Sequence, residues 1–457
     1  MSARRRSNVS TTIETADIDD LSHEGRGIAH HEGKAVFIDD ALPGERVEWT
    51  RRVRGKTFDE GKLERILQPS PDRVTPHCAH FGICGGCALQ HLSAERQIEF
   101  KQRQLIEALA RIGHVAPQEV LPPLQAAVWN YRRRARLAAR WVPKKNRALV
   151  GFRERATPYI TELQRCVVLA KPVDDLIVPL SELVTGLSIR DRVPQIEVSV
   201  ADNAVALVFR VLQPLTTADN ELLVKFAADH NVQIYLQPGG YDTIAPLLPD
   251  AVALSYTLPQ FDVELQFQPT DFVQINAPIN EQMVARAIDL LHLGGGDHVL
   301  DLFCGLGNFS LPLARHARHV VGVEGEAGLV ARAGENARRN GLTNTEFFTA
   351  NLANEDLLDE GANLPKGERE VPLGTPWTRR YYDKVLLDPP RAGAREVLPI
   401  IAKSGASVVV YVSCHPGSLA RDAGILVNEY GFKLTSAGVM DMFPHTAHVE
   451  SIAAFTR

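Results

Sequence analysis

Long hydrophobic runs are missing from this chain of 457 residues, although 45% of them are hydrophobic. No apolar stretch approaches the roughly 20 residues that a membrane-spanning helix needs, so we expect no membrane partner. The N-terminal sequence MSARRRSNVS is basic, but no apolar segment follows it, which predicts the absence of a signal peptide. These absences favour a cytoplasmic protein. The length and the mixed charges predict several globular domains.

Cysteine is scarce as well, since the chain has only six. Three of them, Cys78, Cys84 and Cys87, fall within the run CAHFGICGGC. The cytoplasm keeps thiols reduced, so this cluster predicts metal binding rather than disulfide bonds. A closed site with four ligands needs one more side chain than the run supplies. Three nearby histidines could complete a zinc site: His77, His80 and His91.

A positive net charge is also missing, because the formal net charge is −5. The average argues against a nucleic-acid partner, but the distribution of charge does not. Residues 131–155, YRRRARLAARWVPKKNRALVGFRER, carry ten Lys or Arg against one Glu. Apolar residues within this basic segment, such as Leu137 and Trp141, place it on folded structure. Clustered arginine on a folded surface is typical of contact with a phosphate backbone.

Three regions of different texture follow one another along the chain. Residues 11–67 alternate β-forming residues with Gly, Pro and Asp at spacings typical of a small barrel. A helix is predicted from Ser93 to a stop at Gly113, and residues 125–267 are typical of an α+β region. Beyond them, apolar strands alternate with helices, which predicts a doubly wound, mostly parallel sheet. We therefore predict three domains, at residues 1–68, 69–268 and 269–457.

No complete G-x-G-x-x-G motif opens this sheet, so a dinucleotide cofactor is poorly supported. The segment HVLDLFCGLGNFSLPLA predicts a strand ending at Asp301, a turn with Gly305 and Gly307, and a helix beginning near Asn308. Glu324 ends the next strand about 20 residues after the turn, where an acidic side chain suits ribose hydroxyls. A nucleoside without a phosphate cradle points to S-adenosylmethionine. A tight turn in an unrelated α/β protein would show the same pattern.

Two later strands end in side chains with reactive chemistry. KVLLDPPRAG places Asp388 at the tip of one strand, and SVVVYVSCHPG places Cys414 at the tip of the next. A helix beginning just after Pro416 would favour the thiolate of Cys414. A thiolate that adds to C6 of uracil makes C5 nucleophilic enough to accept a methyl group, and a base must then remove the C5 proton. HTAHVESIAAF offers Glu450 for that step, although an ordinary polar residue at a strand edge fits equally well.

Six segments, taken in order, together resemble the RNA uracil-C5 methyltransferase family: DFVQIN, DLFCGLGNFSLPLA, VGVEG, LLDPPRAG, YVSCHPG and HTAHVES. The resemblance covers most of the chain and implies a nucleophile at Cys414 and a base at Glu450. It also implies contacts to S-adenosylmethionine at Gln274, Phe303, Asn308, Glu324, Asn351 and Asp388. Asn351 departs from the family pattern, because members often carry an acidic residue there.

The rest of the chain fits the same family. The N-terminal segment resembles a TRAM domain, a small oligonucleotide-binding barrel. The cysteine run resembles the family's iron–sulfur pattern, C-x5-C-x2-C with one distant cysteine. This resemblance implies a 4Fe-4S cluster held by four thiolates: Cys78, Cys84, Cys87 and Cys166. Together, the barrel and the cysteine set resemble the branch of the family that modifies 23S ribosomal RNA.

The implied fold is multidomain: an N-terminal OB-like β-barrel of the TRAM type, a central α+β domain with the iron–sulfur cluster, and a C-terminal α/β Rossmann-like class I methyltransferase domain. The implied function is methylation of C5 of a specific uridine in 23S ribosomal RNA, using S-adenosylmethionine and a covalent bond from Cys414 to C6. No obligate protein partner is evident. Three alternatives stay open: a tRNA uracil-C5 methyltransferase, a nitrogen methyltransferase of the adenine type, and a non-catalytic RNA-binding or ribosome-assembly factor. Nitrogen methyltransferases usually have an aromatic residue where this chain has Arg391, and they have no use for Cys414.

Overall fold

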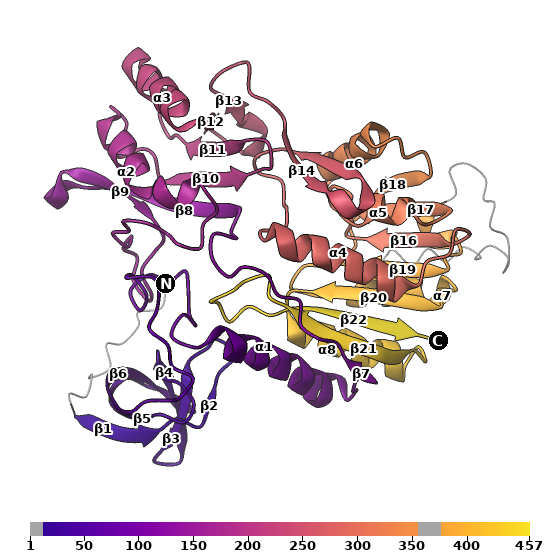
Figure 1. Cartoon of the computed structure of the whole chain (residues 1–457), viewed down its shortest axis with the longest axis horizontal. Coiled ribbons are helices and arrows are strands. Elements are labelled where there is room, and N and C mark those ends of the chain that lie inside the picture. Colours follow the sequence, from indigo (N-terminus) through magenta and orange to yellow (C-terminus); the bar gives the residue numbers. More distant parts are fainter. Residues whose placement is uncertain (1–11, 355–375) are drawn as a thin grey trace. The chain divides into compact units, whose positions relative to one another are not determined.

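The computed structural model describes residues 12–354 and 376–457, and the chain divides into two compact units (Figure 1). The first unit comprises Met1–Lys101, Phe152–Leu163 and Phe443–His448. The second comprises Gln102–Gly151, Gln164–Met442 and Val449–Arg457. Both the central α+β region and the C-terminal sheet belong to the second unit, so the three domain boundaries stay a prediction. None of the helices in the described residues combines the length and apolarity needed to cross a membrane.

The first unit contains a six-stranded sheet in the order β1-β5-β6-β4-β3-β2. Its strands are β1 (Ile13–Asp17), β2 (Asp20–Leu21), β3 (Gly27–His31), β4 (Lys34–Asp39), β5 (Arg46–Arg54) and β6 (Phe58–Gln68). Side chains alternate across a strand, so Val36 and Ile38 of β4 meet Val47 and Trp49 of β5 in one buried core. The sheet curls around this core in the region where a small barrel is predicted (Figure 1).

The helix predicted from Ser93 to Gly113 is confirmed, with one change near its end. It consists of α1 (Ala94–Ala108) and a wider π-helical turn, Leu109–Gly113. This turn packs against α8 (Pro416–Asn428), and glycine makes the close contact possible. A Cβ atom on Gly113 would lie 2.3 Å from the carbonyl oxygen of Ala420, and one on Gly424 would lie 2.7 Å from that of Gly113. The π-turn therefore supports the helix that follows Cys414.

The second unit contains a mixed sheet in the order β13-β12-β11-β10-β8-β9. Its strands are β8 (Arg134–Val142), β9 (Arg147–Gly151), β10 (Gln195–Val200), β11 (Val205–Arg210), β12 (Gln233–Gln237) and β13 (Ala245–Pro246). The accompanying elements are α2 (Ile177–Gly186), α3 (Thr217–His230) and the pair β14 (Leu254–Leu258) and β15 (Val263–Phe267). This composition confirms the predicted α+β character of residues 125–267.

A second, larger sheet has the order β18-β17-β16-β19-β20-β22-β21-β7. Its strands are β7 (Glu119–Val120), β16 (His298–Leu302), β17 (His319–Glu324), β18 (Thr345–Thr349), β19 (Lys384–Leu387), β20 (Val408–Ser413), β21 (Lys433–Met440) and β22 (Glu450–Thr456). The helices around it, besides α8, are α4 (Ala277–Leu291), α5 (Ser310–Ala314), α6 (Ala327–Arg339) and α7 (Leu398–Lys403), as Figure 1 shows. The five neighbouring strands β18, β17, β16, β19 and β20 are parallel, which confirms the predicted parallel sheet. Strand β22 is antiparallel to both of its neighbours.

The order of these strands creates a natural place for a ligand. The chain runs from β16 outward to β17 and β18, and then returns to the other side of β16 to form β19 and β20. At such a reversal, the loops after the two central strands diverge and leave a crevice at the carboxyl ends. By this rule, the crevice is expected after Leu302 and Leu387, beside the end of β20.

Candidate active site

The two residues predicted to act in catalysis come together where β20 and β22 meet. The strands are antiparallel, and their register pairs Ser413 with Ser451. The hydroxyl of Ser451 also donates a hydrogen bond to the carbonyl oxygen of Ser413, at 3.1 Å. Cys414 directly follows Ser413 and Glu450 directly precedes Ser451, so both lie next to the last pair of this ladder. They are close enough for the Glu450 carboxyl to raise the pKa of the Cys414 thiol.

Asp388 joins this pair from the neighbouring strand β19. Its backbone N–H donates to the carbonyl oxygen of Leu302 at 3.3 Å, which ties the ends of β19 and β16 together. The side-chain amide of Gln274 donates to the Asp388 carboxyl at 3.4 Å. Four of the predicted site residues, Gln274, Asp388, Cys414 and Glu450, thus line the same edge of the sheet.

The charges at this edge raise one another's pKa values. Burial raises the pKa of Asp388, and burial together with the Asp388 carboxyl raises the pKa of Glu450. Burial raises the pKa of the Cys414 thiol to about 11, and the carboxyls of Glu450 and Asp388 add to this rise. The guanidinium of Arg391 acts in the opposite direction on both Cys414 and Glu450.

The pKa lowering that we expected from the helix after Cys414 is therefore wrong. Helix α8 does begin at Pro416, as predicted. A helix N-terminus stabilises an anion by only about 0.3–1 kcal/mol at an ordinary surface site. Burial and two nearby carboxyls outweigh that contribution at Cys414.

The turn after β16 brings backbone to the crevice. Phe303, Gly305 and Gly307 all adopt left-handed conformations, with φ of 63°, 55° and 93°. This conformation is uncommon for phenylalanine, and such residues persist where the surrounding structure holds them. The Glu324 carboxylate accepts the N–H of Gly305 at 3.2 Å and that of Gly325 at 2.6 Å. Glu324 therefore lies against the glycine turn, as the predicted contact to ribose requires.

Asn308 and Asn351 differ from the other predicted cofactor contacts. The side-chain amide of Asn308 exchanges two hydrogen bonds of 2.9 Å with Asn280 and accepts a third from the Tyr256 hydroxyl at 3.0 Å. Its amide is therefore engaged within the protein, and its backbone is the part left for a ligand. Asn351 is exposed after β18, and its side-chain oxygen accepts the N–H of Ala353 at 3.1 Å.

Two charged residues of this edge were not predicted to have a role. Arg391 lies three residues after Asp388 and lowers the pKa of both predicted catalytic groups. Asp301 is fully buried at the end of β16 and accepts the Ser310 hydroxyl at 2.5 Å. Burial raises the pKa of Asp301 to about 7, and the nearby carboxyls of Asp388 and Glu324 contribute. In the sequence, only the location of Asp301 and Arg391 near the ends of predicted strands could have indicated a role for them.

The cysteine run forms a loop in the first unit whose backbone is held from several sides. The side-chain oxygen of Gln90 accepts the Cys78 N–H at 3.1 Å, and the Gly86 N–H donates to the Cys84 sulfur at 3.4 Å. The guanidinium of Arg155 donates to the Cys87 carbonyl oxygen at 2.7 Å. Burial raises the pKa of Cys84, and the neighbouring Cys78 contributes to the rise. The thiols are thus partly buried on a fixed backbone.

The predicted metal centre itself stays a prediction. No disulfide bond joins any of the six cysteines, which all lie in the described residues, and Cys166 is buried in the second unit. In residues 12–354 and 376–457, no three His, Cys, Asp or Glu side chains are grouped so as to hold a metal ion. Of the three histidines considered for zinc, His91 is buried against Phe81, with 5.1 Å between the ring centroids. Burial lowers its pKa to about 3.

The basic segment is less positive in the fold than in the sequence. Glu197 pairs with Arg136 at 3.0 Å and with Arg134 at 3.7 Å. Ion pairs of this kind reduce the charge available to a phosphate backbone. Arg140 and Lys144 have exposed side chains at the β8–β9 hairpin. Lys145 and Arg153 of the same segment are exposed as well.

Comparisons with known proteins agree with this geometry. The family model described as tRNA (Uracil-5-)-methyltransferase matches residues 250–457, and the TRAM domain model matches residues 9–48. A crystal structure of the Pyrococcus abyssi tRNA (uracil-54, C5)-methyltransferase in complex with S-adenosyl-L-homocysteine has the same fold, with a TM-score of 0.72. The two are 23% identical, and the alignment covers 97% of this chain and 99% of the other.

Full-length relatives are considerably more similar. The protein of Xanthomonas axonopodis pv. citri (strain 306) named 23S rRNA (uracil(1939)-C(5))-methyltransferase RlmD is 51% identical over 100% of both chains. The proteins of the same name from Xanthomonas campestris pv. campestris (strain 8004) and Stenotrophomonas maltophilia (strain K279a) are 52% and 51% identical, again over 100% of both chains. On this similarity, the chain belongs to the RNA uracil-C5 methyltransferase family.

Proposed function

We propose that this protein methylates C5 of one uridine in 23S ribosomal RNA, with S-adenosylmethionine as the methyl donor. The meeting of Cys414, Glu450 and Asp388 at one sheet edge is the observation that carries the proposal. A thiol beside a carboxyl is what addition to a pyrimidine and later removal of a proton require. The name shared by the full-length relatives supports ribosomal RNA as the substrate.

The proposed reaction has three steps. The Cys414 thiolate bonds to C6 of the uracil, and the electrons of the C5–C6 double bond move toward C5 and O4. C5 then accepts the methyl group that bound S-adenosylmethionine supplies. Glu450 removes the proton from C5, the double bond re-forms, and the bond between C6 and the sulfur breaks. Glu450 must be a carboxylate when it accepts this proton; burial raises its pKa and opposes that form, and the guanidinium of Arg391 lowers its pKa and favours it.

We propose that the glycine turn and the edge beside it hold the cofactor. Glu324 accepts the N–H of Gly305 in the turn and those of Gly325 and Glu326, and it remains partly exposed, which suits contact with ribose hydroxyls. Gln274, Phe303 and Asp388 lie at the same carboxyl edge. Asn308 contributes through its backbone, because its side chain is engaged by Asn280. Asn351 is the proposed contact on the adenine side.

The target uracil must lie outside a helical stack, because the Cys414 sulfur cannot reach C6 of a stacked base. Single-stranded or opened RNA is therefore the proposed form of the substrate. The TRAM match at residues 9–48 supports an additional RNA contact in the first unit. The exposed Arg140 and Lys144 are proposed to contact the phosphate backbone.

We expect cells that lack this protein to lose 5-methyluridine at a single position of 23S ribosomal RNA. Mapping of modified nucleotides by mass spectrometry, in deletion cells and in cells complemented with the gene, measures this directly. Loss from tRNA with intact ribosomal RNA would favour the tRNA alternative. Purified protein that does not bind S-adenosylmethionine in calorimetry would favour the non-catalytic alternative.

We also propose that four thiolates, Cys78, Cys84, Cys87 and Cys166, hold a 4Fe-4S cluster. Hydrogen bonds fix the backbone of the loop that carries Cys78, Cys84 and Cys87, and the N–H of Gly86 donates to the Cys84 sulfur. Both features suit thiolate ligands. In the sequence, Cys87 and Cys166 bracket the basic segment. A cluster bound by both would tie the two ends of that segment together, so we propose a structural role in shaping the RNA-binding surface.

Replacing Cys84 with Ser is expected to remove iron and acid-labile sulfide from anaerobically purified protein and to weaken RNA binding at least about tenfold. His91→Ala is the matched control for the zinc alternative and is expected to keep the iron. Elemental analysis, visible absorption and filter binding of RNA measure these outcomes. Zinc in place of iron in the unmodified protein, lost in His91→Ala, would contradict the cluster. Undiminished RNA affinity without the cluster would contradict its structural role.

A further inference from the structure

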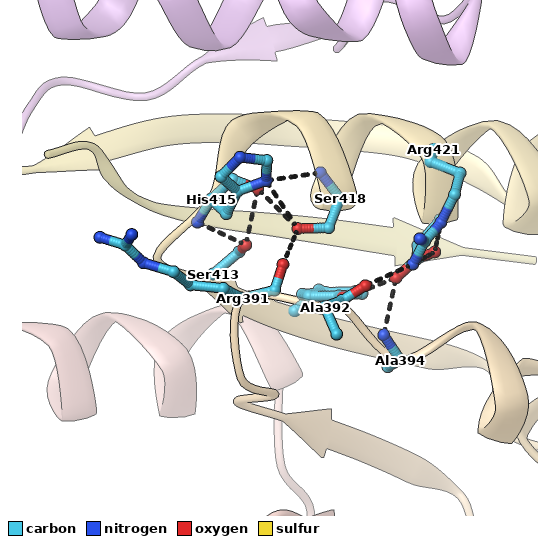
Figure 2. A network of polar contacts seen from close by, with 9 residues as sticks. Arg391, Ala392, Ala394, Ser413, His415, Ser418 and Arg421 are labelled. Atoms are coloured by element: carbon cyan, nitrogen blue, oxygen red, sulfur yellow. Dashed lines mark hydrogen bonds and ion pairs between the residues drawn. The ribbon is translucent and has the colours of Figure 1, made fainter. Parts of the chain in front are cut away.

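Helix α8 holds the backbone of the loop that carries Arg391. We call residues 391–394 the 391–394 loop; it follows the Asp388-Pro-Pro sequence at the end of β19. Three side chains from the first two turns of α8 bind three of its backbone groups, as Figure 2 shows. The contacts are Ser418 Oγ to the Arg391 carbonyl, Arg421 Nη2 to the Ala392 carbonyl, and the Ala394 N–H to Asp422 Oδ2, each 2.8 Å.

The fit between this loop and the helix leaves no room for change. Asp422 is fully buried and also accepts the Tyr411 hydroxyl at 2.7 Å and Arg421 Nε at 2.8 Å, so its carboxylate is fixed. Gly393 lies against it with φ of 90°. A Cβ atom there would lie 2.5 Å from Arg421 Nη2 and 2.6 Å from Asp422 Oδ2. The loop therefore packs closely against α8, and a side chain at residue 393 would force it apart.

The same helix start also holds the segment that carries Cys414. The His415 side chain caps α8, because its Nδ1 accepts the N–H of Ser418 at 3.1 Å. The backbone N–H of His415 in turn donates to the Ser413 hydroxyl at 3.2 Å. Ser418 thus contacts the loop after β19 through its hydroxyl. It contacts the segment after β20 through its backbone N–H and also through that hydroxyl, which lies 3.0 Å from His415 Nδ1 (Figure 2).

These contacts hold the backbone of Arg391, which fixes the point from which its side chain extends. Its carbonyl faces Ser418, whereas its guanidinium extends away from the network (Figure 2). That guanidinium is the positive group that counters two carboxyls at the thiol, since it lowers the pKa of both Cys414 and Glu450. The attraction between a cation and a thiolate falls with their separation, so the position of the 391–394 loop determines how strongly Arg391 acts.

We propose that Ser418, Arg421 and Asp422 are positioning residues for methyl transfer, which lock the 391–394 loop to α8 so that Arg391 stays beside Cys414 and Glu450. The inference rests on the proposed function, because it assigns these residues a role in that reaction. They act through Arg391 and make no contact with the substrate themselves. Their effect is therefore expected on the rate of reaction of bound RNA, with RNA binding left unchanged.

The test measures single-turnover methylation by Ser418→Ala and Arg421→Gln proteins at neutral pH. Each is expected to lower the rate at saturating RNA about tenfold, the factor that one unit of thiol pKa represents. The KM values for RNA and S-adenosylmethionine are expected to stay within about twofold. Ser418→Thr keeps the hydroxyl and should recover most of the rate. Arg395→Gln, at an exposed arginine directly after the loop, is the matched control and should react like the unmodified protein.

A double-mutant cycle with Arg391→Ala separates positioning from general destabilisation. If Ser418 and Arg421 act through Arg391, their replacement should change the rate less than about twofold once Arg391 is alanine. The same tenfold loss in both backgrounds, or an unchanged rate in the single variants, would overturn the proposal. Arg421 is partly exposed, so its variant decides the question if Ser418→Ala does not fold. Unmodified protein that methylates no uridine would instead refute the proposed function.

Discussion

The Cys414→Ala protein is expected to form no covalent bond with RNA and to lose methylation by at least about 10⁴-fold, as expected when a covalent nucleophile is removed. C5 of uracil is inert until a nucleophile occupies C6, and Cys414 is the proposed nucleophile. Transfer of tritium from methyl-labelled S-adenosylmethionine to 23S ribosomal RNA measures the loss. Binding of S-adenosylmethionine, followed by calorimetry, should persist, because the glycine turn and Glu324 are untouched.

RNA that carries 5-fluorouridine provides a second test of the Cys414→Ala protein, because it traps the covalent adduct. Fluorine at C5 cannot leave as a cation, so the adduct of the unmodified protein should survive a denaturing gel, and Cys414→Ala should show none. Cys304→Ser is the matched control, since Cys304 is the other cysteine at a strand end of this sheet. It is buried, and burial raises its pKa well above the usual value, so its replacement should leave the adduct intact. Methylation that survives in Cys414→Ala would favour the nitrogen methyltransferase.

The parallel strands were predictable because each is a short, continuous apolar run bounded by turn residues. Buried parallel strands such as β16 and β20 have this pattern, and their ends then place Asp388 and Cys414 at one edge. The antiparallel contact that brings Glu450 to Cys414 depends on the insertion of β22 between β20 and β21. A local pattern identifies β22 as a strand, but it carries no information about its neighbours.

Other features depend on contacts between distant parts of the chain. Segments Phe152–Leu163 and Phe443–His448 join the first unit although their sequence neighbours belong to the second. Asn308 was predicted to contact the cofactor, which stays a prediction, and only the structure shows that Asn280 engages its side chain. The thiol pKa of Cys414 follows from the sum of burial and three charges, which the start of a helix alone does not predict.

The Glu450→Gln protein is expected to accumulate a covalent RNA adduct that already contains the new methyl group. Glutamine has the shape of glutamate but cannot take up the proton from C5. The Cys414 sulfur can leave C6 only when that proton departs, so the reaction should stop after methyl transfer. Radiolabel from the methyl group of S-adenosylmethionine, found in the cross-linked band of a denaturing gel with unmodified RNA, is the measurement. The unmodified protein should release its RNA and show almost none of this band.

Whether the trapped RNA adduct contains the new methyl group shows at which step Glu450 acts. Glu429→Gln, at an exposed carboxyl after α8, is the matched control and should turn over normally. An adduct without the methyl group would place Glu450 at an earlier step. Clean release of methylated RNA by Glu450→Gln would refute its role and direct attention to Asp388, whose carboxyl has a raised pKa at the same edge.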